Sequence, residues 1–143
     1  MITFTNIRNV TYSDYDEVWA IMRYIKANKN YVQVQELAPS YQLFSDYRRL
    51  VADNEWNKVT FDHVYVPRFL RSMCARESRN KLNELFQKDK QGIRICAFCT
   101  CIEEEFCHRS IVAGLLQGVG ADVRGVKKDY SEYYRMWKEL TSR

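Results

Sequence analysis

One junction restricts the fold of this sequence more than any other feature. An apolar segment of strand length, GIRICAFCT at residues 92–100, leads through a polar loop into an apolar helical segment, HRSIVAGLLQG at residues 108–118. A continuous apolar strand is typical of a sheet that is covered on both faces. A strand that leads into a helix in this way is typical of α/β proteins, in which helices connect parallel strands.

The same alternation of strand and helix extends along the rest of the chain. Further strands are predicted at ITFTNI (2–7), VWAIMRYI (18–25) and ADVRGV (121–126), with a short extended piece at 31–34. Helices are predicted over 38–52, from Thr60 to Leu70, over 78–89 and over 130–140. Pro67 must bend or divide the second of these helices. We therefore predict a three-layer α/β fold with a mainly parallel central sheet and an inserted helical segment at residues 39–90.

Length and composition limit the classes of protein to consider. The 143 residues fit a single domain over 1–143, and 46% of them are hydrophobic, which excludes wholesale disorder. No apolar run approaches the roughly 20 residues that a membrane span needs, and the first residues lack the pattern of a secretion signal. Five cysteines in such a chain are expected to stay reduced, so we expect a cytoplasmic protein that does not bind membranes.

The basic residues are concentrated in one stretch. Arg68, Arg71, Arg76, Arg79 and Lys81 are opposed there only by a single glutamate. Such a stretch can face the phosphates of a nucleic acid. The net charge of +4 is far from that of dedicated nucleic-acid binders, so a solvated helix face is the favoured interpretation.

The side chains with the most chemistry gather where the buried strand ends and the next helix begins. Cys99, Cys107, His108 and Arg109 all lie at this junction, where open α/β sheets usually bind their ligands. The helix N-terminus and the Arg109 guanidinium suit an anion. We expect the same surroundings to lower the pKa of Cys107, which would favour nucleophilic chemistry. For His108 two interpretations stay open, a general base and a hydrogen-bond donor at the helix end.

A metal site is the main chemical alternative for these cysteines. Cys96 and Cys99 have the C-x2-C spacing of many zinc ligands. Within a strand, however, residues three apart point to opposite faces, whereas Cys99 and Cys101 share a face. We therefore predict no bound metal and no cofactor, and we expect Cys96 and Cys74 to pack as small apolar residues.

The segment FCTCIEEEFCHRSIVAGLL at residues 98–116 resembles the signature of the DUF488 family, small uncharacterised proteins of bacteria and phages. In that family an apolar strand ends in Leu-Cys-x-Glu, and a Phe-Cys-His-Arg block opens the following helix. Cys99 matches the strand cysteine, while Cys107, His108 and Arg109 match the block. One position departs from the pattern, because Cys101 stands where the family usually has glutamate.

Weaker matches extend the resemblance over roughly residues 1–118. LAPSYQLF, which contains Ser40, is similar to a block before the first helix of the family, and AIMRYI is similar to a strand that carries an arginine, here Arg23. Thr5 matches a threonine near the end of the first strand. The resemblance implies a three-layer α/β fold but supplies no established reaction.

These observations lead to a functional hypothesis with two alternatives. We expect a pocket for an anionic small molecule or a nucleotide, with hydrolytic or group-transfer chemistry. Its catalytic candidates are Cys99, Cys107 and His108, and its binding candidates are Arg23, Ser40, Arg109 and Thr5. The first alternative is a protein that sequesters a ligand or binds nucleic acid without turnover, and the second is a structural metal module.

Overall fold

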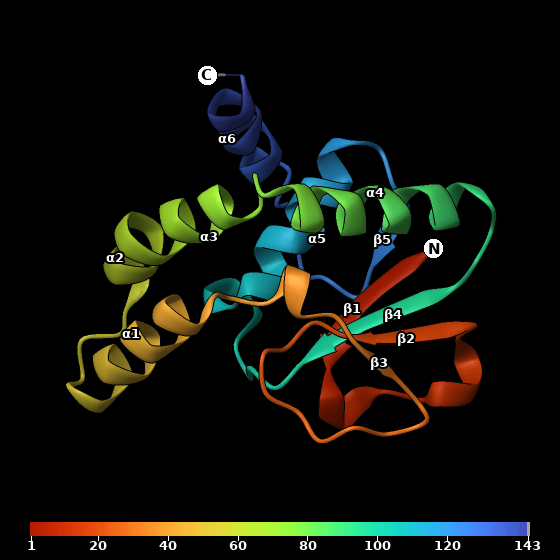
Figure 1. Cartoon of the computed structure of the whole chain (residues 1–143), viewed down its shortest axis with the longest axis horizontal. Coiled ribbons are helices and arrows are strands. Elements are labelled where there is room, and N and C mark those ends of the chain that lie inside the picture. Colours follow the sequence, from red (N-terminus) through yellow and green to blue (C-terminus); the bar gives the residue numbers. More distant parts are fainter. Residues whose placement is uncertain (143) are drawn as a thin grey trace.

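The computed structural model of the chain describes residues 1–142 and contains a five-stranded sheet in which every pair of neighbouring strands is parallel (Figure 1). The strands are β1 (Ile2–Asn6), β2 (Glu17–Ala20), β3 (Val32–Gln33), β4 (Ile95–Cys99) and β5 (Val123–Arg124), and they are arranged in the order β3-β2-β4-β1-β5. The most buried strand, β4, lies between β1 and β2. The sheet and its helices confirm the predicted three-layer α/β class.

Four of the six α-helices form the insertion between β3 and β4, as predicted. The α-helices are α1 (Tyr41–Ala52), α2 (Lys58–Thr60), α3 (Val66–Ser72), α4 (Arg76–Lys90), α5 (His108–Gly118) and α6 (Glu132–Thr141). A π-helical turn at Phe61–Tyr65 joins α2 to α3, and Pro67 lies in the first turn of α3, where its missing N–H costs no helical hydrogen bond. None of the helices in residues 1–142 has the length and apolar character to cross a membrane.

The two faces of the sheet are covered by different structures. One face contributes residues such as Phe4, Trp19 and Ala97 to the main core, where they pack with helices that include α3, α4 and α5. The other face presents Val18, Ala20, Cys96 and Phe98, which are covered by two short 3-10 helices with their caps and by loops. The covering side chains are Ile7, Val10, Tyr15, Met22, Ile25 and Tyr31.

The second face explains a difference from the sequence prediction. The apolar run at residues 18–25 was expected to be one strand, but β2 ends at Ala20. Met22 and Ile25 instead lie in the following loop and pack against the second face of the sheet. The run is apolar because it supplies both a buried strand and part of its cover, and Arg23 consequently lies in the loop rather than on the strand.

Helix α5 packs closely against α6 and the turn before it at two of the glycines of α5. A Cβ atom built on Gly114 of α5 would lie 2.1 Å from the Tyr130 carbonyl oxygen, and one built on Gly118 would lie 2.1 Å from Cβ of Tyr134. Both glycines are therefore required by the close approach of α6 and its preceding turn. This packing fixes α5, whose first turn belongs to the site described next.

Candidate functional site

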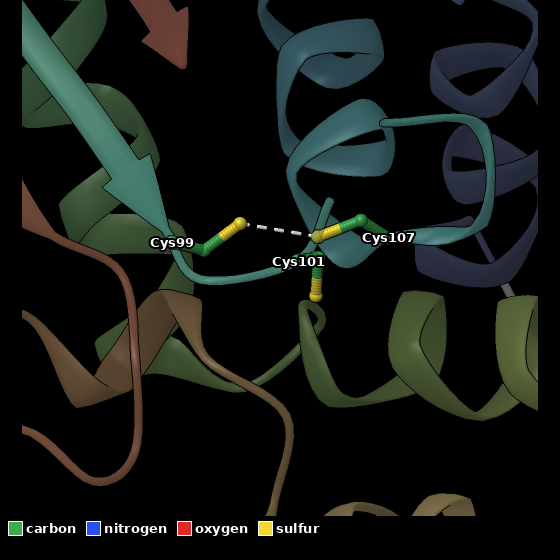
Figure 2. Close-up of side chains that lie close together, drawn as sticks. All are labelled: Cys99, Cys101 and Cys107. Atoms are coloured by element: carbon green, nitrogen blue, oxygen red, sulfur yellow. Dashed lines mark hydrogen bonds between the residues drawn. The ribbon is translucent and has the colours of Figure 1, made fainter. Parts of the chain in front are cut away.

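Three cysteines converge at the carboxyl end of β4. Cys99 is the last residue of the strand, Cys101 lies in the loop that follows, and Cys107 directly precedes α5. Their three sulfur atoms lie within 4.8 Å of one another, and the sulfurs of Cys99 and Cys107 are only 3.2 Å apart (Figure 2). Cys99 and Cys107 are each about 1% exposed, so this contact is shielded from bulk water.

Arg109 provides the positive charge of this cluster. Its Nη1 donates hydrogen bonds to Sγ of Cys99 at 3.2 Å and to the carbonyl oxygen of Cys101 at 2.7 Å. The side chain is buried, and among residues 1–142 no carboxylate lies within 4.0 Å of it. A buried cation needs an anionic partner, so the guanidinium group is matched to a thiolate at Cys99.

The three thiols differ in acidity. Hydrogen bonds from Cys101 and Cys107, together with the charge of Arg109, hold the pKa of Cys99 well below its ordinary value. Burial raises the pKa of Cys107 well above its ordinary value, and hydrogen bonds to the neighbouring sulfurs act in the same direction. The sequence analysis expected the pKa of Cys107 to be lowered, and that expectation is wrong because burial outweighs the field of the helix N-terminus. Of these thiols Cys99 is therefore the one that ionises most readily.

Cys96 shows the contrasting case of a structural cysteine. It packs against Val18 and Phe98 on the second face of the sheet, away from the other three sulfurs. Burial raises its pKa to about 12. The strand-parity argument that separated Cys96 from Cys99 is confirmed.

His108 is held in one tautomer by the backbone. Its Nε2 lies 2.6 Å from the carbonyl oxygen of Ile21, and because a carbonyl only accepts, Nε2 carries the hydrogen. Nδ1 is then an acceptor in the neutral ring, and it lies 3.6 Å from Sγ of Cys107. The imidazole therefore joins the residue that follows β2 to α5 and places a ring nitrogen beside the cluster.

Two residues that the sequence analysis did not select as site residues shape the loop between β4 and α5. Asn6, at the end of β1, donates from Nδ2 to the carbonyl oxygens of Thr100 and Cys101 at 3.1 and 2.8 Å. Glu104 is buried and accepts hydrogen bonds from Tyr130 Oη at 2.6 Å and from the Lys127 amide at 2.9 Å. Glu104 therefore anchors the loop to the turn before α6. No periodicity in the sequence reveals such contacts, because their partners are distant along the chain.

A small, largely aromatic pocket opens beside the cysteines. Its volume is about 90 Å³. It is lined by Met22, Arg23, Tyr24, Pro39, Phe44, Tyr47, Tyr65, Cys99, Thr100, Cys101, Phe106, Cys107 and His108. Four predicted site residues thus share one pocket: Arg23, Cys99, Cys107 and His108. Arg109 lies behind the pocket and acts on it through Cys99.

Arg23 lies at this pocket without a carboxylate partner. Its Nε donates to the carbonyl oxygen of Pro39 at 2.6 Å, and its Nη2 lies 3.5 Å from that of Gln35. A second pocket, of about 400 Å³, shares Tyr24 and Phe44 with the first and is also lined by Arg48. The Arg48 guanidinium carbon lies 5.9 Å from the centre of the Phe44 ring. The two pockets are therefore adjacent, and each is lined by one of the two arginines together with aromatic rings.

Ser40 and Thr5, the remaining binding candidates, do not line the pocket. Ser40 is the N-cap of α1, where its hydroxyl accepts a hydrogen bond from the Leu43 amide at 3.2 Å. Thr5 pairs in register with Phe98, so its side chain lies on the face of the sheet opposite Cys99.

The cap predicts the effect of changing Ser40. Ser40→Ala is expected to lower the free energy of unfolding by about 1 kcal/mol, because an amide of the first turn of α1 loses its acceptor. Ser40→Asp keeps an acceptor and is expected to restore most of this stability. Urea unfolding of the three proteins measures the difference. Equal stability of the serine and alanine proteins would contradict the capping role.

Comparison with known proteins identifies a family whose model matches most of the chain. The model of DUF488-N3a, described as the active DUF488-N3 subclade, matches residues 6–120, which include every residue of the cysteine cluster and its pocket. No curated protein and no solved structure matches the chain significantly.

Proposed function

The chain belongs to the DUF488 family, and from this premise we propose that it is a cysteine-dependent enzyme that transfers a group from an anionic small molecule to Cys99. The observation that carries the proposal is the hydrogen bond from the buried Arg109 to the sulfur of Cys99, which lines the pocket. The description of the matched subclade as active is consistent with chemistry rather than simple sequestration.

The geometry gives each nearby group a role. A thiolate is the nucleophilic form of cysteine. The hydrogen bond from Arg109 stabilises this form of Cys99, and among residues 1–142 no carboxylate pairs with the guanidinium in place of the sulfur. The aromatic walls exclude water from the sulfur, and Arg23 meets an anionic group of the substrate near the pocket. His108 Nδ1, on the far side of Cys107, accepts or returns a proton.

The nucleophile can be tested without knowing the substrate. Reduced protein is treated with iodoacetamide over a range of pH, and each cysteine is followed by peptide mass spectrometry. We expect Cys99 to react at pH 7, with a rate that changes little between pH 7 and 8, whereas an ordinary thiol gains up to about tenfold over that interval. Slow reaction of Cys99 with a tenfold rise would contradict the proposal. Cys96 provides the internal comparison.

The position of Arg23 at the pocket predicts that its guanidinium binds an anionic group of the substrate. Purified protein is screened for thermal stabilisation by carboxylated and phosphorylated small molecules, since a specific ligand stabilises the folded state by mass action. Arg23→Gln is expected to weaken binding of the best ligand by about tenfold or more, because a charge-assisted hydrogen bond contributes roughly 1.5–3 kcal/mol. Unchanged affinity would remove Arg23 from the site. A ligand that binds without ever modifying Cys99 would instead favour the sequestering alternative.

A further inference from the structure

We infer that Cys107 is a resolving thiol for Cys99, so that the pair reduces small anionic disulfides; this inference rests on the proposed function and names its substrate class. The contact that carries it is the 3.2 Å separation of the two sulfurs (Figure 2). A disulfide bond is about 2.05 Å long, so the two atoms need to approach by only about 1.1 Å. Both side chains face the same pocket.

The two sulfurs are suited to different steps. Cys99 receives a hydrogen bond from Arg109, which stabilises it as the attacking thiolate. Among the hydrogen bonds of the described residues Cys107 receives none from a cation; it contacts Cys99 and, at 3.6 Å, Nδ1 of His108. It therefore keeps its proton until Cys99 has been modified, and the imidazole nitrogen is placed to take that proton. The Cys101 sulfur lies within 4.8 Å of both, but the 3.2 Å contact of Cys99 is with Cys107, which makes Cys107 the resolving partner.

The steps balance in atoms and electrons. The Cys99 thiolate attacks one sulfur of the substrate R–S–S–R, the S–S bond breaks, and one RS⁻ leaves, which gives the mixed disulfide Cys99–S–S–R. Cys107 transfers its proton to His108, attacks Sγ of Cys99 and displaces the second RS⁻, which takes up that proton. The product is a Cys99–Cys107 disulfide: the protein has lost two electrons and the substrate has gained two. An external dithiol returns the protein to its reduced form.

The pocket chemistry favours a disulfide that carries negative charge. Sulfur makes favourable contacts with aromatic rings, and Tyr24, Phe44 and Phe106 are among the rings on the approach to Cys99. Arg23 lines this pocket and Arg48 the adjacent one, and neither has a carboxylate within 4.0 Å in the described chain, so both suit the carboxylates of the substrate. The pocket of about 90 Å³ beside Cys99 admits the disulfide group of the substrate, while the pocket of about 400 Å³ holds the rest of the substrate.

Oxidised glutathione, an anionic disulfide, is the probe for the test. Reduced wild-type protein is expected to lose two hydrogens in its intact mass and to release two molecules of reduced glutathione per chain. Cys107→Ser is expected to stop at a mixed disulfide on Cys99, with one glutathione released. Cys99→Ser is expected to release none, and Cys96→Ser, the matched control, to behave as wild type. Bis(2-hydroxyethyl) disulfide, which is uncharged, is expected to react at least about tenfold more slowly.

The outcomes separate this inference from the proposed function. If Cys99 is alkylated rapidly at pH 7 but glutathione forms neither an adduct nor a Cys99–Cys107 disulfide, the resolving role is wrong and the proposed nucleophile stands. If Cys99 resists alkylation as well, both fail. A disulfide between Cys99 and Cys101 in the wild-type protein would assign resolution to the wrong thiol and overturn the inference, as would equal rates with the charged and uncharged disulfides.

Discussion

Arg109→Met is expected to slow the alkylation of Cys99 at pH 7 by about tenfold or more. Methionine fills much of the same space but removes the hydrogen bond and the positive charge that stabilise the thiolate. A charge-assisted hydrogen bond is worth roughly 1.5–3 kcal/mol, so its loss is expected to raise the pKa of Cys99 and to reduce the thiolate population by about tenfold or more. Because the pKa of Cys99 is lowered in the folded protein, its loss of reactivity appears at neutral pH and disappears once the pH exceeds the raised pKa.

The pH profile makes this prediction specific. As the pH rises, the difference in rate between the Arg109→Met and wild-type proteins is expected to narrow, since a growing fraction of Cys99 in the variant is then ionised. Arg109→Lys keeps a charge but loses the planar Nη1 group, which donates to both Cys99 and the Cys101 carbonyl, so it is expected to recover only part of the rate. A uniform loss of rate at all pH values, together with a lowered melting temperature, would show that Arg109 supports the fold rather than the thiolate.

Gly114→Ala is expected to destabilise the protein by about 3 kcal/mol, near the upper end of the usual cost of over-packing. The added methyl group would lie 2.1 Å from the Tyr130 carbonyl oxygen, so α5 and the start of α6 must separate. Helix propensity alone predicts the opposite sign, because alanine is the better helix former. Thermal unfolding measures the effect, and a fall of roughly 10 °C in melting temperature is expected for a chain of this size.

A second glycine controls for backbone effects. Gly92 has a φ of +79° but no atom within 4 Å of the place where a Cβ would lie. Gly92→Ala is therefore expected to cost only the roughly 1–2 kcal/mol of an unfavourable backbone conformation. A smaller loss in Gly114→Ala than in Gly92→Ala would contradict the close packing of α5 against α6.

The sequence predicted the elements with strong local signals and missed those that depend on distant partners. The strand at residues 92–100 and the helix at 108–118 are both present, because continuous apolar character and helical periodicity identify them locally. The end of β2 was misplaced, since an apolar residue such as Met22 has the same local pattern whether it continues a strand or covers a sheet. Tertiary packing decides between the two.

The features of the candidate site also divide into those that the local sequence identifies and those that depend on distant partners. The block of Cys107, His108 and Arg109 was visible because its residue types are concentrated in a few positions. The acidity of Cys99 relative to Cys107 was not, because it depends on which sulfur Arg109 reaches and on how deeply each is buried. Glu104 belongs to a run of three glutamates, and nothing local distinguishes it, because its hydrogen bond from Tyr130 depends on the packing of a turn 26 residues away.

The position of β4 between β1 and β2 has a consequence for how the chain folds during synthesis. The first two strands pair with β4 and not with each other, and β2 has only the two-residue β3 as another neighbour. A ribosome-bound chain that ends before residue 95 can therefore form helices but no central sheet. Such long sequence separations between contacting residues favour slow, cooperative folding. Cys99 meets Arg109 only when this late strand has inserted, so the nascent chain carries ordinary thiols and becomes reactive at the last step.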